Sequence, residues 1–216
     1  MMKLRQLEIE LEEVLKFKNP KVYLEQYMTP PHLAACLLHM ADSKFHDIYG
    51  KTVLDIGCGS GILSCGASLL GADYTLGVDI DEDALTLFRE NCSMLVPSNS
   101  VECLQCDIRQ YMTNKSFRTS FDVIFMNPPY GTKNNKGIDM EFLEAATNMF
   151  KTAIYSLHKT STRKYVCKRA KSMGLDASVQ AELRYNLDAT FTFHKVKSKD
   201  IEVDFIRFTP TKQTVK

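Results

Sequence analysis

The amino-acid sequence predicts an α/β fold of the Rossmann-like type: a seven-stranded sheet with the last strand antiparallel and helices on both faces. Three observations predict it. Short apolar runs alternate with helical patterns along most of the chain. A glycine-rich turn at residues 57–61 joins the first such run to a helical pattern. The last two runs, 177–187 and 201–208, are joined without a long helix, as an antiparallel pair allows.

The composition is that of a soluble globular protein, with 216 residues, of which 44% are hydrophobic and 25% charged. The net charge of +1 favours neither the presence nor the absence of nucleic acid. Seven cysteines at irregular spacing indicate reduced thiols rather than a disulfide framework. The start of the sequence has no apolar signal core, and no run approaches membrane-spanning length. We therefore expect an intracellular protein, in the nucleus or nucleolus and the cytoplasm, without a membrane span.

The N-terminal region contains two predicted helices. Leucines at helical spacing among glutamates predict an amphipathic covering helix at 3–14. A second helix is predicted to run to about Ala41, with Thr29 as its N-cap and Pro30 at its first position. Gln26 and Thr29 lie just before this helix, where they could close over a ligand, although capping alone would explain Thr29.

The first strand, at 51–56, is followed by Gly57, Gly59 and Gly61. Glycines allow positive φ and a close approach of the backbone to a ligand. Dinucleotide binders need the spacing Gly-x-Gly-x-x-Gly, and Ile62 occupies the position of their third glycine. The spacing therefore disfavours a nicotinamide cofactor and favours S-adenosylmethionine, which has no pyrophosphate to hold.

The second strand, at 74–79, ends in an acid 22 positions after Gly57. An acid at this place in the fold binds ribose hydroxyls. Asp79 is therefore the predicted ribose ligand. Asp81 is predicted to cap the helix at 82–92.

The third strand, at 101–106, is followed by Asp107 and Ile108. Asp107 could accept a hydrogen bond from an adenine amino group while Ile108 packs on the ring. Cys103 and Cys106 have the spacing of a weak metal motif, but an odd separation in a strand places two side chains on opposite faces. We therefore interpret both thiols as strand residues.

The fourth strand, at 121–126, ends abruptly in Asn127-Pro128-Pro129-Tyr130. Neither proline can donate to a sheet ladder, and the first of them makes the preceding residue extended. The Asn127 side-chain oxygen and the Pro128 carbonyl could accept the two N–H groups of a planar exocyclic amine, and Tyr130 could stack on its ring. Taken alone, the tetrapeptide is equally well explained as a turn that ends a strand.

We expect no metal site in the rest of the sequence, because His158 and His194 have no carboxylate or cysteine at ligand spacing. Four further elements are predicted in this part of the chain. They are a polar, basic loop at 131–137, a helix at 139–150, a fifth strand at 153–158 and a basic helix at 161–173.

Charge is distributed unevenly along the chain. Residues 151–199 contain eleven Lys or Arg and three Asp or Glu, whereas residues 1–150 contain 13 basic and 20 acidic residues. A basic C-terminal third can bind phosphates and steer a polyanion toward the strand ends. The residues predicted to contact an RNA substrate are Lys133, Asn134, Lys136, Lys159, Arg163, Lys195 and Lys197.

Together these elements match the class I S-adenosylmethionine-dependent methyltransferase fold. The glycine turn and the Asn-Pro-Pro-Tyr segment both follow parallel strands, so a methyl donor and an acceptor would meet at one edge of the sheet. The sequence resembles the methyltransferase-like protein 5 family over about residues 3–208. The motifs that carry this resemblance lie at 24–32, 79–84, 126–137, 155–159, 181–185 and 200–204.

The resemblance implies an N6-adenosine methyltransferase that acts on small-subunit (18S) ribosomal RNA together with a zinc-binding activator of the Trm112 type. The implied catalytic residues are Asn127, Pro128, Pro129 and Tyr130. The implied cofactor contacts are Gln26, Thr29, Gly57, Ser60, Ile62, Asp79, Asp107 and Ile108. This sequence has Tyr130 where the family often has Phe, and Ser60 where it often has Cys; both changes keep the required feature, an aromatic face and a small residue.

We expect one compact domain overall, with N-terminal helices over the cofactor site (1–50), the Rossmann-like part (51–210) and a tail (211–216). The third strand of such a fold lies at a sheet edge, and in 101–106 only Glu102 is charged. An apolar edge invites strand addition by another chain. We therefore predict that the activator pairs with this strand and that the isolated protein is poorly soluble.

Three alternatives stay open on the sequence alone. Release-factor methyltransferases use the same Asn-Pro-Pro-Tyr segment on a protein glutamine, although the basic segments favour RNA. A non-catalytic RNA-binding adaptor would keep the fold, but the intact glycines, Asp79 and Asn127 favour an enzyme. A nicotinamide oxidoreductase is disfavoured by Ile62.

Overall fold

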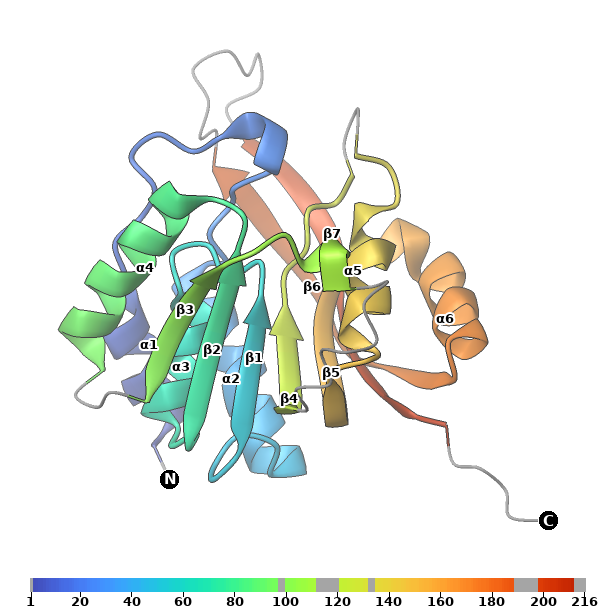
Figure 1. Cartoon of the computed structure of the whole chain (residues 1–216), viewed down its shortest axis with the longest axis horizontal. Coiled ribbons are helices and arrows are strands. Elements are labelled where there is room, and N and C mark those ends of the chain that lie inside the picture. The colour runs from blue at the N-terminus through green and yellow to red at the C-terminus, as the bar shows by residue number, and fades with distance from the viewer. Residues whose placement is uncertain (1, 97–99, 112–120, 132–134, 189–197, 212–216) are drawn as a thin grey trace.

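The computed structural model describes residues 2–96, 100–111, 121–131, 135–188 and 198–211. Its centre is a seven-stranded sheet in the order β3-β2-β1-β4-β5-β7-β6 (Figure 1). β7 is antiparallel to both of its neighbours, and the other pairs are parallel. The predicted fold class is therefore confirmed. The strands are β1 (Thr52–Ile56), β2 (Tyr74–Asp79), β3 (Val101–Gln105), β4 (Phe121–Met126), β5 (Phe150–Lys159), β6 (Leu175–Asp188) and β7 (Ser198–Pro210).

Helices cover both faces of the sheet. One face packs against α1 (Leu4–Glu12), α2 (Pro31–Phe45), α3 (Ile62–Leu69) and α4 (Glu82–Leu95). The other face packs against α5 (Ile138–Ala146) and α6 (Arg163–Ser172). Three short 3₁₀ helices complete the described elements: η1 (Val22–Leu24), η2 (Ile108–Tyr111) and η3 (Thr160–Thr162). No helix among the described residues is both long and apolar enough to cross a membrane.

The two faces are supplied by alternating residues of the same strands. In β1, Val53 packs with the first group of helices and Leu54 with the second. Cys103 and Cys106 are an odd number of positions apart, and they pack on opposite faces of the sheet for the same reason. The prediction that these thiols point apart is confirmed. Within the described residues, no group of three or more His, Cys, Asp or Glu is placed to hold a metal ion.

Two predicted boundaries were wrong. The helix expected at 139–150 ends at Ala146, and Phe150 already belongs to β5, where it pairs with Phe121 of β4. The stabilisation that Phe150 gains by pairing with β4 outweighs the helical tendency of this segment. The second N-terminal helix begins at Pro31 with Pro30 as its N-cap, so Thr29 is not its cap.

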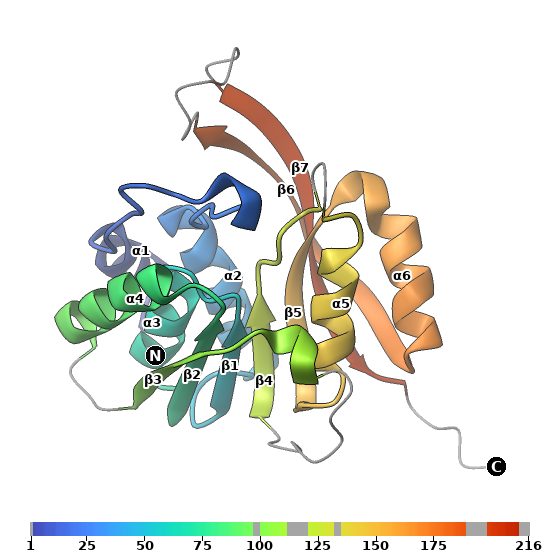
Figure 2. The ribbon, with the colours of Figure 1, turned by 45° about the horizontal axis from the view of Figure 1, so that its top comes forward.

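The strand ends define the position of the site. In the β1–β4 ladder Ile56 pairs with Met126, so Gly57 and Asn127 follow directly at the same carboxyl edge. β6 and β7 form a long hairpin that projects beyond this edge, as Figure 2 shows. The proposed division of the chain at residues 50 and 210 stays a prediction, although α1 and α2 share one core with α3 and α4.

Candidate active site at the carboxyl edge of the sheet

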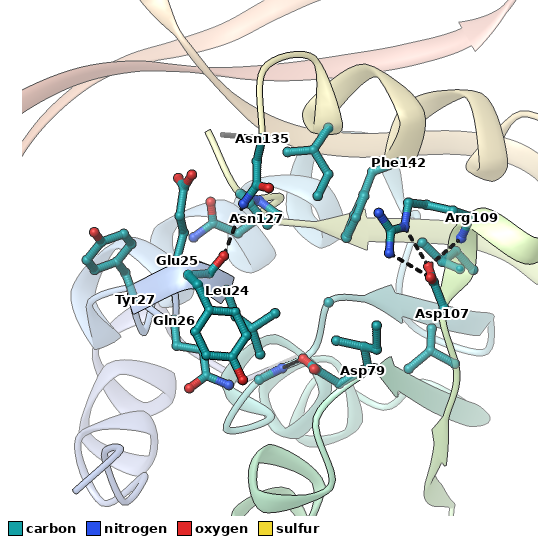
Figure 3. Close-up of a pocket in the computed structure, with 18 of the residues that line it drawn as sticks. Leu24, Glu25, Gln26, Tyr27, Asp79, Asp107, Arg109, Asn127, Asn135 and Phe142 are labelled. Carbon is teal, nitrogen blue, oxygen red and sulfur yellow. Dashed lines mark hydrogen bonds and ion pairs between the residues drawn. The ribbon is translucent and has the colours of Figure 1, made fainter. Parts of the chain in front are cut away.

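A cleft with about 1020 Å³ of empty space opens at the carboxyl edge of the sheet. Its wall includes Gly57, Asp79, Asp107 and Asn127, which come from the ends of four neighbouring strands. Figure 3 shows the last three of them around the opening. A smaller hollow shares Gly57 and Asn127 with it. Of the predicted site residues, the cleft is lined by Gln26, Gly57, Asp79, Asp107, Ile108, Asn127 and Pro129, and the hollow by Thr29, Gly57, Ser60, Ile62 and Asn127. The structure thus brings the predicted donor residues and Asn127 together.

The glycine turn lets other side chains approach its backbone. Gly57 has φ +72°, and a Cβ there would lie 3.1 Å from Cε1 of Phe142, across the cleft. Gly61 has φ +86°, and a Cβ there would lie 2.7 Å from Cδ2 of Phe88 in α4. Both positions combine left-handed backbone with crowding, which an L side chain tolerates poorly. The first glycine therefore keeps the cleft open, and the third packs the turn on α4.

The carboxylate of Asp79 is fixed at the end of β2. One oxygen accepts the backbone N–H of Gly59 at 2.9 Å, and the other accepts that of Asp81 at 3.0 Å. Burial raises the pKa of Asp79, and the two backbone hydrogen bonds act in the opposite direction. An oriented carboxylate that lines the cleft is suited to accept from a pair of ribose hydroxyls.

Asp107 is held by the residue two positions after it. Arg109 donates to its two oxygens from Nε at 2.8 Å and from a terminal nitrogen at 2.7 Å. The Arg109 guanidinium lowers the pKa of Asp107, which is therefore ionised. Ile108 between them is buried and lines the cleft. This arrangement presents an acceptor and an apolar surface side by side, as binding of an adenine requires.

The side chain of Asn127 is oriented by two hydrogen bonds. Its Nδ2 donates to Oγ1 of Thr29 at 3.0 Å, and its Oδ1 accepts from the hydroxyl of Tyr130 at 3.3 Å. In this arrangement the amide nitrogen is directed at Thr29 and Oδ1 is left as the acceptor, so Thr29 is a partner of Asn127 instead of the predicted helix cap. Pro128 is buried and Tyr130 is half-buried next to it.

A segment of the N-terminal region, residues 21–29, crosses the cleft; we call it the strap. Lys21 pairs with Asp81 at 2.5 Å and with Asp83 at 2.7 Å, and Gln26 donates to the other oxygen of Asp81 at 2.6 Å. Asp81 also caps α4 by accepting from the N–H of Asp83, as predicted. Its burial is outweighed by the Lys21 and Gln26 contacts, which lower its pKa. The role of Asp81 as an anchor of the strap was not predicted.

Sequence reasoning missed two buried carboxyl groups at the site. Asp55, in β1, lines the hollow and accepts from the hydroxyl of Ser64 at 2.6 Å. Its burial raises its pKa to about 7. Glu25, in the strap, lines the cleft and accepts the backbone N–H of Tyr130 at 2.8 Å. Asp55 lies two positions before Gly57, a signal that could have found it, whereas no local pattern marks Glu25.

The predicted RNA-contacting residues have different environments. The Lys159 ammonium lies 5.6 Å from the centre of the Tyr130 ring, and Lys136 is exposed. Arg163 is held by Asp204, with two contacts of 2.6 Å, and by Glu182 at 3.0 Å. Its predicted contact with RNA would have to compete with these ion pairs and stays a prediction without structural support. Lys133, Asn134, Lys195 and Lys197 lie outside the described residues.

His158 has polar partners that its sequence neighbourhood did not indicate. The buried ring contacts Asp139 of α5 at 3.1 Å and Ser156 at 2.9 Å. These contacts tie the end of β5 to the first turn of α5. They also satisfy both ring nitrogens of a buried histidine.

Among the described residues, the edge strand β3 has a strand partner on one side only. That partner is β2, and Leu104 of β3 is 46% exposed. Next to it, a groove with about 830 Å³ of empty space is lined by residues of α4 and β3, among them Phe88, Val101 and Cys103. The predicted position of this strand at the sheet edge is confirmed.

Comparison with known proteins gives a consistent result. The sequence profile of the family Ribosomal protein L11 methyltransferase (PrmA) matches residues 33–128. The chain is 53% identical to the rRNA N(6)-adenosine-methyltransferase Mettl5 of Drosophila melanogaster, with 96% of each chain covered. It is 50% identical to the rRNA N(6)-adenosine-methyltransferase METTL5 of Danio rerio, with 97% of this chain and 100% of the relative covered. The crystal structure of a candidate RNA methyltransferase from Pyrococcus horikoshii, PH1948, superposes with a TM-score of 0.84 at 31% identity over 99% of both chains.

Proposed function

The chain belongs to the Mettl5 family of rRNA N(6)-adenosine-methyltransferases, and we propose that it methylates N6 of an adenosine in small-subunit (18S) ribosomal RNA, with S-adenosylmethionine as donor. One observation carries the proposal. The ladder between β1 and β4 pairs Ile56 with Met126, so the donor turn at Gly57 and the acceptor group of Asn127 line one cleft. The methyl group would therefore pass from donor to acceptor within this one cleft.

The cleft fits S-adenosylmethionine, which when bound supplies an electrophilic methyl group on a sulfonium. The bare Cα of Gly57 leaves the space that a Cβ would fill. Asp79 presents a fixed carboxylate to ribose hydroxyls, and Asp107 presents one to an adenine amino group. We propose that the donor is held by Gln26, Thr29, Gly57, Ser60, Ile62, Asp79, Asp107 and Ile108.

The acceptor amine of adenine is a poor nucleophile because its lone pair is delocalised into the ring. We propose that Oδ1 of Asn127 and the carbonyl of Pro128 accept its two N–H groups and so direct the lone pair toward the methyl group. Thr29 keeps Oδ1, rather than Nδ2, on the accepting side. No strong base is required, because the proton can leave after the transfer.

Tyr130 would hold the base by stacking, which contributes roughly 1–3 kcal/mol per base in single-strand binding. Its hydroxyl contacts Oδ1 of Asn127 at 3.3 Å, so an incoming amine takes over an acceptor that the chain itself already occupies. The Lys159 ammonium beside the ring is placed to meet a phosphate next to the stacked base. Because a stacked, splayed base is required, an unpaired adenosine is the favoured substrate.

We propose that a Trm112-type zinc-binding activator adds a strand to β3. The support is the side of this edge strand on which the described residues place no further strand, the exposed Leu104, and a groove beside it that apolar and charged residues line together. We also propose that the protein acts in the nucleus, nucleolus and cytoplasm, where ribosomal RNA is made and used.

The deciding experiment maps methylated adenosines on ribosomal RNA from cells with and without this protein. We expect one small-subunit adenosine to lose its N6-methyl group. A purified chain with its activator is then offered naked ribosomal RNA and, separately, a release factor. Methylation of a release-factor glutamine instead of RNA would replace this proposal with the protein-methylating alternative.

A further inference from the structure

The strap forms three hydrogen bonds with Asn127, Tyr130 and Asn135, which we call the acceptor segment. Thr29 meets Asn127, Glu25 meets the backbone N–H of Tyr130 at 2.8 Å, and the carbonyl of Tyr23 accepts from Nδ2 of Asn135 at 3.0 Å. The partners run in opposite directions, since rising numbers in the strap meet falling numbers in the acceptor segment. Figure 3 shows Glu25, Asn127 and Asn135 gathered on one side of the opening.

Glu25 is the strap residue whose backbone is most unusual. It ends η1 with φ +51° and ψ +45°, a left-handed conformation that favours glycine and disfavours a glutamate. Glu25 is only 8% exposed, although glutamates are rarely buried unless they are paired. The left-handed turn aims the carboxylate at Tyr130. A strained residue with a buried, bonded carboxylate at the edge of an active site indicates a functional constraint.

The next residue connects the strap to the donor side. Gln26 donates to Asp81, whose own N–H is held by Asp79, the predicted ribose ligand. Two adjacent strap residues thus reach opposite walls of the cleft. Glu25 holds the segment that receives the base, and Gln26 holds the strand end that receives the donor.

We propose that Glu25 is a positioning residue for the methyl acceptor: its carboxylate fixes the backbone of Tyr130, and thereby the stacking ring, relative to the donor. This inference rests on the proposed methyl transfer. Glu25 touches neither reacting atom and acts through Tyr130. The hydrogen bond, rather than the negative charge, carries the effect.

Three variants separate the effect of the Glu25–Tyr130 hydrogen bond from that of the negative charge and from that of the left-handed backbone. Glu25→Gln keeps an oxygen that can accept the Tyr130 N–H and removes the charge. Glu25→Ala removes both. Glu25→Gly removes both but relieves the left-handed backbone, so it folds even if the alanine variant does not. Each is assayed as the full chain with its activator, for kcat and KM on a ribosomal RNA fragment and for S-adenosylmethionine binding by calorimetry.

We expect Glu25→Ala and Glu25→Gly to lower kcat by about 10- to 100-fold, the effect of leaving the partly buried N–H of Tyr130 without its acceptor. The affinity for S-adenosylmethionine should hardly change in these variants. Glu25→Gln should keep most of the wild-type kcat. Full turnover in the glycine variant would overturn the proposal. A glutamine variant as slow as the alanine variant would also overturn it, because the charge would then be responsible.

A readout that needs no turnover distinguishes this inference from the proposed function. Amide hydrogen exchange at Tyr130 should be faster in the alanine and glycine variants than in the wild type or the glutamine variant. Unchanged exchange would refute the role of Glu25 whatever the substrate is. Faster exchange in the alanine and glycine variants, together with a wild type that does not methylate RNA, would leave the positioning contact intact and refute only the proposed reaction.

Discussion

The hydroxyl of Thr29 accepts a hydrogen bond from Nδ2 of Asn127 at 3.0 Å, across 98 positions of sequence. Because the amide nitrogen points at Thr29, the amide oxygen lies on the other side of the same group. The oxygen is then left for Tyr130 or for an incoming amine. Activity should therefore depend on Thr29 even though its hydroxyl need not touch the acceptor.

Replacing Thr29 by valine keeps the branched shape and removes the acceptor for Asn127. We expect kcat to fall by about tenfold, the effect of losing a typical net hydrogen bond of about 1.4 kcal/mol. Thr29→Ser is the matched control, because it keeps the hydroxyl, and it should retain most of the activity. Steady-state methylation of a ribosomal RNA fragment measures both. Equal rates for the serine and valine variants would show that the amide needs no orientation by this hydroxyl.

Replacing Asn127 by alanine removes the acceptor itself. We expect turnover to fall by about 100-fold or more, as when one preorganised polar contact to a transition state is deleted. Donor affinity should be nearly kept, because other residues hold the donor. Single-turnover rates together with calorimetric donor binding test this. Retained turnover would refute the role given to the Asn127 side chain.

Replacing Tyr130 by phenylalanine separates the ring from its hydroxyl. The ring stays available for stacking, and Oδ1 of Asn127 loses an internal competitor. We expect kcat/KM for RNA to be equal to or higher than that of the wild type, whereas Tyr130→Ala should lose about 10- to 100-fold through lost stacking. If phenylalanine were as poor as alanine, the hydroxyl would have a direct catalytic role.

Asp55 predicts a pH dependence of stability. Its pKa rises from 3.8 to about 7 because the carboxyl group is buried. The folded state therefore binds more protons than the unfolded state between these two values, so this group's contribution to stability is full below about pH 4 and is lost as the pH rises to about 7. Asp55→Asn is neutral throughout and should flatten this part of the profile. Urea unfolding at several pH values compares the two, and parallel profiles would contradict the assignment.

Two lysines on the edge strand test the proposed partner surface. Leu104→Lys places a charge on the exposed face of β3, and Val101→Lys places one on its opposite face, where Val101 is half-buried; both charges lie beside the edge and discourage strand addition. We expect the activator to be lost on copurification, and methylation with it. Ile9→Lys, which charges an exposed apolar residue of α1, is the control. Good solubility of the isolated wild-type chain, with unchanged activity of the double variant, would count against this surface.

Local patterns were sufficient for the architecture and for the position of the site. The period of two in 101–106 already placed Cys103 and Cys106 on opposite faces, and the structure agrees. The glycine turn and the proline pair each mark a strand end, and the parallel topology brings these ends to one edge. These features depend on residues close in sequence and on the repeat of the backbone, which is why one sequence reveals them.

Only the tertiary structure decided which side chains act together. Glu25 and Tyr130 are 105 positions apart, and His158 finds Asp139 on a different element. Arg163 looked available for RNA, but Asp204 of β7 holds it. Such pairings depend on how separate elements pack and on which buried polar groups need partners, and no local pattern records either. The sequence alone therefore predicted which strand ends line the candidate site, and the packing of the strap on these strand ends decided how its groups are aimed.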